Sequence, residues 1–190
     1  PELTVKDVKM SVPGLHYIEN ATAAIAIGYK LGLNAEQLKK GIESFKGVSR
    51  RFEVKHPNKP VFIDDYAHHP EEINATIEAI RMLYPGQKIT GIFQPHLYSR
   101  TRDLADEFAV SLSKLDDIIL LDIYPAREKP IDGITSSMIL DKIEHSKKQI
   151  LGKAETLGYV ETIKTDILLT IGAGDIGLLA DEIEQIIKRS

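Results

Sequence analysis

The sequence predicts an α/β fold, with a mostly parallel, Rossmann-like open sheet covered by helices on both faces and preceded by the helical tail of another domain. Largely apolar stretches, typical of parallel strands buried on both faces, alternate with amphipathic stretches after residue 60. Between residues 20 and 45 the apolar residues follow a helical period instead. We therefore expect two domains, 1–46 and 47–190, joined by a linker near 46–49.

The first domain is expected to contain an extended segment and two helices. Residues 3–12 alternate apolar and polar side chains, which predicts an extended segment that Pro13-Gly14 ends. An apolar stripe predicts a helix from residue 20 to residue 31. Asn34 and Gln37 have the spacing of a capping box and predict a second helix that ends near Phe45.

The second domain is expected to alternate strands and helices along its whole length. The predicted elements are strand 61–66, helix 70–84, strand 89–94, helix 102–115, strand 117–124, helix 136–145, strand 149–151, helix 154–163, strand 166–171 and helix 176–188. Strand 117–124 is the most apolar and is expected to lie at the centre of the sheet.

Composition excludes several classes of protein. A net charge of −4 excludes a protein that binds nucleic acid by bulk cationic attraction, and the absence of cysteine excludes disulfides and thiolate chemistry. No apolar run reaches the roughly 18 residues of a membrane span, and no signal peptide opens the chain. We expect a soluble cytoplasmic protein without membrane or nucleic-acid partners and, because it begins at Pro1, a fragment.

Polar side chains are concentrated in the segments that follow the predicted strands, where ligands bind to parallel sheets. Segment 64–70 contains two carboxylates, a phenol and two imidazoles, and segment 94–102 contains two guanidinium groups suited to carboxylate or phosphate. Isolated residues of these types are usually solvated or capping, but their concentration here favours a binding site. Segment 124–130 is either a lid or a solvated connection.

Two other patterns are not interpreted as cofactor sites. Residues 172–177 have the spacing GxGxxG, but only 13 residues follow Gly177, too few for the second strand and ribose-binding acid of a dinucleotide site. The side chains of Asp65, His68, His69 and His96 are possible zinc or iron ligands, yet their spacing does not require a metal. We predict no metal site.

Six motifs in order resemble the Mur ligase family of bacterial cell-wall synthesis over essentially the whole chain. They are Pro13-Gly14-Leu15-His16 with Asn20, Arg50-Arg51-Phe52, Asp64-Asp65-Tyr66-Ala67-His68-His69-Pro70, Gln94-Pro95-His96 with Tyr98-Ser99-Arg100-Thr101, Ile123-Tyr124-Pro125-Ala126, and Gly172-Ala173-Gly174-Asp175-Ile176-Gly177. The pattern is most similar to the members that join L-alanine to UDP-N-acetylmuramate.

The resemblance implies an ATP-dependent, Mg²⁺-requiring ligase that acts through an acyl phosphate and has three domains. It implies that residues 1–46 end the central ATPase domain and that residues 47–190 form the C-terminal domain that closes over the active site. Because the sequence lacks a GxxxxGK[ST] loop, we expect the fragment to be inactive without its own N-terminal and central domains.

The resemblance also implies roles for individual residues. His16, Asn20, Arg51 and Asp65 are expected to bind ATP, with Asn20 at the adenine, Asp65 at the ribose and Arg51 at the phosphates. Tyr66, His96 and Arg100 are expected to bind substrate, with Arg100 at the alanine carboxylate. His68 and His69 are the expected catalytic residues, because a histidine can accept a proton from the alanine ammonium.

Two positions differ from the usual family pattern, and two alternative functions remain. Tyr17 stands where the family usually has Asn, and Leu97 stands where it usually has Arg. One alternative is the recycling ligase that attaches a murein peptide to the same sugar nucleotide, although its second loop usually differs from Gln94-Pro95-His96. The other is a non-catalytic nucleotide-binding α/β module.

Overall fold

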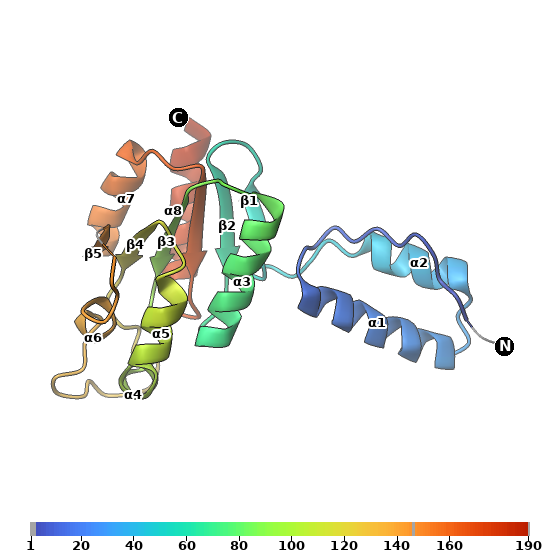
Figure 1. Ribbon diagram of the computed structural model, residues 1–190, viewed down its shortest axis with the longest axis horizontal. Helices are drawn as coiled ribbons and strands as arrows, with labels where there is room; N and C mark the ends of the chain where they lie inside the picture. The colour runs from blue at the N-terminus through green and yellow to red at the C-terminus, as the bar shows by residue number, and fades with distance from the viewer. Residues whose placement is uncertain (1–2, 146, 190) are drawn as a thin grey trace. The chain divides into compact units, whose positions relative to one another are not determined.

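The computed structural model describes residues 3–145 and 147–189, without the side chain of His16. The chain divides into two compact units, of which unit 1 ends at Ser49 and unit 2 begins at Arg50 (Figure 1). The expected domain boundary lies three residues earlier in the sequence. The two units are described separately below.

Unit 1 is a pair of helices, α1 (Leu15–Lys30) and α2 (Ala35–Ser44). The predicted capping box is confirmed, because the Asn34 side chain accepts from the Gln37 amide while the Gln37 side chain accepts from the Asn34 amide. Helix α1 begins five residues earlier than predicted, directly after Gly14. The described residues of segment 3–12 contain no strand, since no neighbouring strand offers them hydrogen bonds.

Unit 1 buries little apolar surface. Val12 and Leu38 are its buried apolar side chains, and an apolar groove of about 430 Å³ runs between the helices. Several large apolar side chains of this unit are exposed, namely Leu15, Ile18, Ile27, Leu31, Leu33, Phe45 and Val48. A pair of helices this short has no second layer against which to bury both of its apolar sides.

Unit 2 contains one six-stranded sheet in the order β1-β2-β6-β3-β4-β5 (Figure 1). The strands are β1 (Glu53–His56), β2 (Val61–Asp65), β3 (Ile89–Phe93), β4 (Asp117–Leu120), β5 (Lys148–Ile150) and β6 (Ile167–Ile171). Strand β1 pairs antiparallel with β2, and every other pair is parallel. The predicted α/β class with a mostly parallel, Rossmann-like sheet is confirmed.

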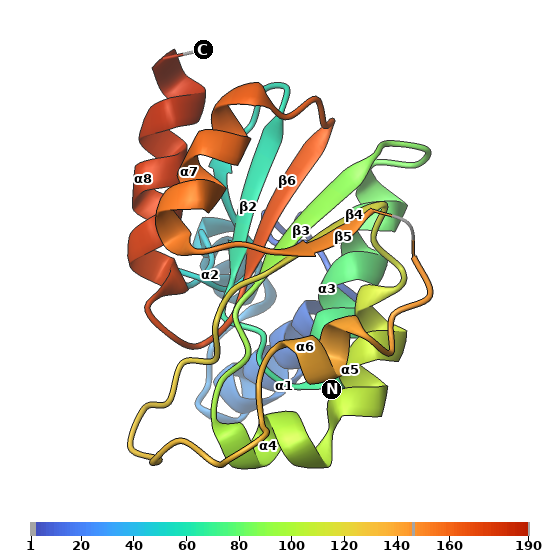
Figure 2. The same cartoon turned by 90° about the vertical axis from the view of Figure 1, so that its left-hand side faces the viewer.

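Helices cover both faces of this sheet. They are α3 (Pro70–Leu83), α4 (Tyr98–Asp103), α5 (Ala105–Leu112), α6 (Ser137–Leu140), α7 (Lys153–Thr162) and α8 (Ile176–Arg189). Figure 2 shows α7 and α8 against one face and α3, α5 and α6 against the other. Successive side chains of a strand point to opposite faces, so the core has two parts. Phe62 packs on the α7 and α8 side, and the adjacent Ile63 points to the opposite face.

Three predicted elements are corrected by the structure. Strand 117–124 is not central: β4 ends at Leu120 and lies next to the edge strand, while β6 and β3 occupy the centre. Apolar content does not specify strand order, because every parallel strand here is covered on both faces. Helix 102–115 is divided at Leu104, where the backbone leaves the helical region, and helix 136–145 is reduced to α6.

Strand β1 was absent from the sequence prediction. It is four residues long, half-buried, and interrupted by an irregularity between Val54 and His56, so its sequence has no regular alternation.

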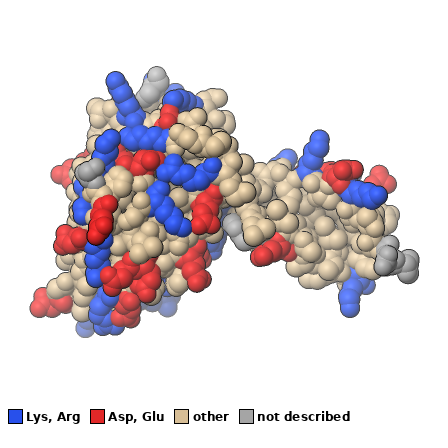
Figure 3. Space-filling model, viewed as in Figure 1, with Lys and Arg blue, Asp and Glu red and all other residues tan. Residues whose placement is uncertain are grey.

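Among the described residues, every helix is too short or too polar to span a bilayer. On the face of unit 2 shown in Figure 3, basic and acidic side chains are interspersed.

Candidate functional site

The candidate site lies at the carboxyl edge of the sheet. Asp65 at the end of β2 pairs with Ile171 at the end of β6, and Ile171 pairs with Phe93 at the end of β3. The residues that follow these strands, including Tyr66 and Gln94, therefore emerge side by side. The loops that the sequence predicted to share an edge do so.

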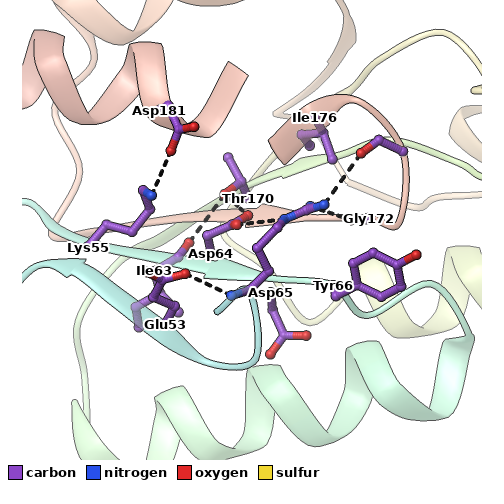
Figure 4. Close-up of polar contacts among 12 residues, drawn as sticks. Glu53, Lys55, Ile63, Asp64, Asp65, Tyr66, Thr170, Gly172, Ile176 and Asp181 are labelled. Carbon is purple, nitrogen blue, oxygen red and sulfur yellow. Dashed lines mark hydrogen bonds and ion pairs between the residues drawn. The ribbon is translucent and has the colours of Figure 1, made fainter. Parts of the chain in front are cut away.

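Arg50 connects β2 to the turn after β6. Its Nε donates to Asp64 Oδ2 at 2.9 Å, and its Nη2 donates to the carbonyl oxygen of Gly172 at 2.6 Å. Thr170 Oγ1 donates to the other Asp64 oxygen at 2.7 Å (Figure 4). Burial raises the pKa of Asp64 above its ordinary value, a shift that Thr170 and Arg50 reduce. This partly buried ion pair joins β2 to the turn after β6.

The glycines of turn 172–177 serve close packing within the protein. A Cβ at Gly174 would lie 2.7 Å from Cγ of Tyr124, and a Cβ at Gly177 would lie 2.7 Å from Cζ of Arg50. Both distances are shorter than any real Cβ contact. The GxGxxG spacing is thus explained by neighbouring side chains rather than by a dinucleotide.

Asp65 is a buried acceptor in the structure. Its Oδ2 accepts from the amide of Phe52 at 2.8 Å, and its Oδ1 accepts from the amide of Ala67 at 2.8 Å. Burial raises the pKa of its carboxyl group, and these two hydrogen bonds reduce the shift. Asp64 and Asp65 point to opposite sides of β2 (Figure 4). The ribose contact expected for Asp65 stays a prediction, and the burial of Asp65 weighs against it.

Four rings from three loops form a continuous line, which we call the aromatic row: Tyr66, His68, His96 and Tyr124. The centroids of Tyr66 and His68 lie 5.5 Å apart, those of His68 and His96 lie 6.1 Å apart, and those of His96 and Tyr124 lie 5.7 Å apart. The last pair is stacked with an interplanar angle of 23°. Three residues of the predicted site, Tyr66, His68 and His96, are therefore brought together.

Arginines stand beside the aromatic row. Cζ of Arg51 lies 5.3 Å from the ring centroid of Tyr66, and its Nη1 lies 3.8 Å from a carboxylate oxygen of Glu72. Nη1 of Arg100, on α4, lies 3.4 Å from the carbonyl oxygen of His68. The predicted phosphate-binding and carboxylate-binding residues thus lie at the same edge.

The surroundings of the His96 imidazole favour its neutral form. Its Nδ1 is buried and has no hydrogen-bond partner among the described residues. Burial lowers the pKa of His96, and the positive charge of Arg100 lowers it further. A neutral imidazole next to a guanidinium group can accept a proton or a hydrogen bond from a ligand.

The two predicted catalytic histidines differ in their surroundings. Nδ1 of His68 lies 3.1 Å from the carbonyl oxygen of Tyr66 and 3.3 Å from Glu72 Oε2. In neutral His68 these acceptors assign the proton to Nδ1 and leave Nε2 as the basic nitrogen. His69 is exposed and caps α3, where its Nδ1 accepts from the amide of Glu71 at 3.4 Å. The structure places His69 at the helix start rather than in the aromatic row.

Two predicted ATP-binding residues belong to unit 1. Asn20 lies on α1 and lines the apolar groove together with Tyr17. His16 is also within α1, but its side chain lies outside the described residues. Their adenine-side roles stay predictions.

The sequence analysis overlooked two acidic residues of this edge. Oε2 of Glu72 accepts from the amides of His68 and His69 and thereby fixes the backbone of the first loop. The spacing from His69 to Glu72 is that of a capping box and offered a signal for it. Glu128 binds Ser99 from a distant loop, and no local pattern indicates that contact.

Asp64 and Asp65, the carboxylates at the end of β2, do not fit a Mg²⁺ site. Both oxygens of Asp64 and of Asp65 are occupied by donors from the protein. Among the described residues, no group of three His, Asp or Glu side chains converges as a metal ion requires.

One family matches the chain. The sequence model described as "Mur ligase, glutamate ligase domain" matches residues 50–180, which are most of unit 2.

Curated relatives extend this similarity to unit 1. The UDP-N-acetylmuramate--L-alanine ligase of Flavobacterium psychrophilum is 48% identical over 187 residues, which are 97% of this chain and 42% of that protein. The ligase of the same name from Parabacteroides distasonis is 48% identical over 188 residues, which are 98% of this chain and 41% of that protein. The chain spans about two fifths of the length of these relatives.

Solved structures share the fold. The UDP-N-acetylmuramate-alanine ligase of Thermotoga maritima matches with a TM-score of 0.74 and 28% identity, over 96% of this chain and 39% of that one. A murein peptide ligase from Psychrobacter arcticus matches with a TM-score of 0.65 over 96% of this chain and 39% of that one. Its identity of 19% shows the fold alone.

Proposed function

Because this chain belongs to the Mur ligase family, whose glutamate ligase domain matches residues 50–180, we propose that it is the C-terminal part of an ATP-dependent ligase that joins L-alanine to UDP-N-acetylmuramate. Relatives that carry this activity in their names support the substrate assignment at 48% identity. The aromatic row beside Arg100 is the observation that carries the proposal at the level of the site.

The reaction is amide formation through an acyl phosphate. The γ-phosphoryl group of ATP passes to the lactyl carboxylate of UDP-N-acetylmuramate and leaves ADP. The neutral amine of L-alanine then attacks the acyl carbon, and inorganic phosphate departs from the tetrahedral intermediate. One proton is released when the alanine ammonium becomes an amine, so the protein needs a proton acceptor near that nitrogen.

The aromatic row supplies the amino-acid side of this reaction. The Arg100 guanidinium holds the alanine carboxylate through charge-assisted hydrogen bonds. The rings of Tyr66 and His96 exclude water from the attacking amine, which protects the acyl phosphate from hydrolysis. The lowered pKa of His96 keeps its ring neutral, so it does not repel the alanine ammonium.

His68 is the proton acceptor in this proposal. Its Nδ1 faces the Tyr66 carbonyl and the Glu72 carboxylate, and its Nε2 is the nitrogen with the free lone pair. His69 is the alternative base that the sequence suggested, but its Nδ1 is used in the cap of α3.

We also assign the residues that bind ATP. Arg51 binds the ATP phosphates, and His16 and Asn20 bind the adenine. In this assignment unit 1 is the end of the central ATPase domain, and unit 2 is the C-terminal domain. The exposed apolar side chains of unit 1, such as Ile27 and Leu31, support the assignment because they match an element that packs into a larger domain.

ATP, Mg²⁺, UDP-N-acetylmuramate and L-alanine are the proposed cofactors and substrates, and the bacterial cytoplasm is the proposed location. Because the oxygens of Asp64 and Asp65 are occupied, we assign the metal ion to the central domain, where a phosphate-binding loop is expected. The protein's own N-terminal and central domains are its proposed partners.

Phosphate release by the full-length protein tests the function. The assay contains ATP, Mg²⁺ and UDP-N-acetylmuramate, and compares L-alanine with L-alanyl-γ-D-glutamyl-diaminopimelate. We expect release that depends on L-alanine. Release with the peptide alone would assign the recycling reaction, and no release with either amine would favour a non-catalytic module.

A further inference from the structure

The first turn of α4 is capped by a residue from another part of the chain. The helix begins after Leu97, whose φ of 74° is unusual for a residue other than glycine, and Leu97 makes no side-chain cap. The first amides of a helix lack intrahelical acceptors and need partners. Oε2 of Glu128 accepts from the Ser99 amide at 3.0 Å, and Oε1 accepts from Ser99 Oγ. Glu128 is therefore the cap that Leu97 cannot provide.

Glu128 belongs to segment 124–128, which we call the strap. The strap turns back on itself, because the Glu128 amide donates to the carbonyl of Pro125 at 2.9 Å and Ala126 has a φ of 49°. Its other end is fixed at Tyr124, whose amide donates to the carbonyl of Pro95 at 2.8 Å. The strap is thus fastened at both ends to the segment that follows β3.

The two ends of the strap lie next to the His96–Tyr124 stack and next to Arg100. Tyr124 stacks on His96, and the carbonyl oxygen of Tyr124 accepts from the Leu97 amide at 2.9 Å. Ser99, which donates two hydrogen bonds to Glu128, directly precedes Arg100. Hydrogen bonding to Ser99 lowers the pKa of Glu128, which keeps its carboxylate charged at a helix N-terminus, where negative charge is favoured.

We propose that Glu128 is a positioning residue that clamps the strap to α4 and thereby sets where Arg100 and the His96–Tyr124 stack lie when the amino acid binds. Glu128 itself is not expected to touch the substrate. We call the hydrogen bonds between Glu128 and Ser99 the clamp. Its effect on amino-acid binding rests on the proposed ligase function, whereas the hydrogen bonds belong to the fold.

Hydrogen exchange in the 190-residue chain tests the clamp without any assay of activity. We expect Glu128→Ala to raise the exchange rate of the Ser99 amide about tenfold, since roughly 1.4 kcal/mol of capping energy corresponds to that factor. Asp103→Ala is the matched control, because Asp103 is a carboxylate of the same helix that pairs with exposed Arg102. Equal exchange of Ser99 in the two variants would overturn the clamp.

A double-mutant cycle separates the clamp from general destabilisation. Ser99→Ala removes only the hydroxyl contact with Glu128, and the amide contact remains. If the two residues act together, the effects of Ser99→Ala and Glu128→Ala on the free energy of unfolding will be less than additive. Additive effects would show that the residues do not interact and would overturn the proposal even if one variant folds poorly.

The full-length protein tests the role in substrate binding. We expect Glu128→Ala to raise KM for L-alanine about tenfold while KM for ATP changes less than about twofold. A clamp without a role in positioning would leave KM for L-alanine unchanged, and a general loss of structure would raise both constants. Either result would overturn the positioning role. Absence of ligase activity in the unmodified protein would instead refute the proposed function, and the exchange result would stand.

Discussion

The adjacent arginines Arg50 and Arg51 have different contacts and different roles in this protein. Arg50 and Arg51 are neighbours in the sequence and both lie over the ring of Tyr66, but Arg50 pairs with buried Asp64 while Arg51 faces Glu72. The positive φ of Arg50, 60°, and the hydrogen bond from the Tyr66 amide to its carbonyl at 2.6 Å set this division. Because the Arg50 guanidinium is occupied by Asp64 and the Gly172 carbonyl, Arg51 is the arginine suited to a phosphate.

At the same scale, His96 is expected to titrate below the ordinary histidine value of 6.5. Because Arg100 contributes to the shift, Arg100→Gln should raise the pKa of His96 toward that value, while Arg102→Gln on the same helix should not. NMR titration of the imidazole signals measures both. An unchanged His96 pKa in Arg100→Gln would contradict the arrangement.

The lowered pKa of His96 also predicts that the protein loses stability as the pH falls. Below about pH 6.5 the unfolded chain takes up a proton at this position more readily than the folded chain, so protonation favours unfolding. The free energy of unfolding should therefore fall more between pH 7.5 and pH 5 in the unmodified chain than in His96→Gln. Urea denaturation at the two pH values measures the difference, and an equal fall in both proteins would refute it.

At the scale of elements, the turn from β6 to α8 is shaped by its neighbours. The buried side chain of Gln94 donates to Asp175 Oδ1 at 2.8 Å and accepts from the Ile176 amide at 2.9 Å, so it caps α8 from a neighbouring strand end. The glycine at 174 is needed because Gln94 and Tyr124 occupy the space of a side chain. The turn, the cap and the stack on His96 are thus one packed assembly.

Substitution of a glycine tests this packing. A Cβ at Gly174 would meet Tyr124 Cγ at 2.7 Å and the side-chain oxygen of Gln94, so we expect Gly174→Ala to destabilise the chain by about 1–3 kcal/mol. The matched control is Gly158→Ala within α7, where nothing lies within 4 Å. Because alanine favours a helix over glycine by about 1 kcal/mol, the control should be stabilising. Urea denaturation distinguishes the two, and equal effects would contradict this account of the turn.

At the scale of the whole molecule, the two units differ in how much apolar surface they bury and so in their ability to fold independently. Unit 2 buries apolar side chains on both faces of its sheet, whereas unit 1 buries few and exposes many. A domain of about 140 residues buries roughly two-thirds of the surface of its unfolded chain, enough for independent stability, but a two-helix unit does not. We therefore expect unit 2 to fold without unit 1.

Truncation at the boundary tests this and the role of Arg50. A fragment of residues 48–190 should fold and unfold cooperatively, because it keeps Arg50 with Asp64. A fragment of residues 51–190 should be less stable by about 3 kcal/mol, since it leaves the buried Asp64 carboxylate without its ion-pair partner. Thermal denaturation by circular dichroism compares them. Equal midpoints would mean that Arg50 is not the link between β2 and the turn.

By itself the sequence determined the alternation of strands and helices, the mostly parallel sheet, the capping box at Asn34 and the edge at which the loops meet. These features depend on local periodicity and on a general rule of parallel sheets, so they can be read from neighbouring residues. The sequence also suggested Tyr66, His68, His96 and Arg100 as parts of one site. The three rings contact one another in a row, and Arg100 contacts the backbone carbonyl of His68.

Only the tertiary structure decided the order of the strands, the burial of Asp65 and the hydrogen bonds between Glu128 and Ser99. Each depends on contacts between residues that are distant in the chain or on the direction of a side chain, and neither is encoded in a local pattern. Hydrogen bonds such as that from Phe52 to Asp65 or from Ser99 to Glu128 form only once the sheet has placed both partners.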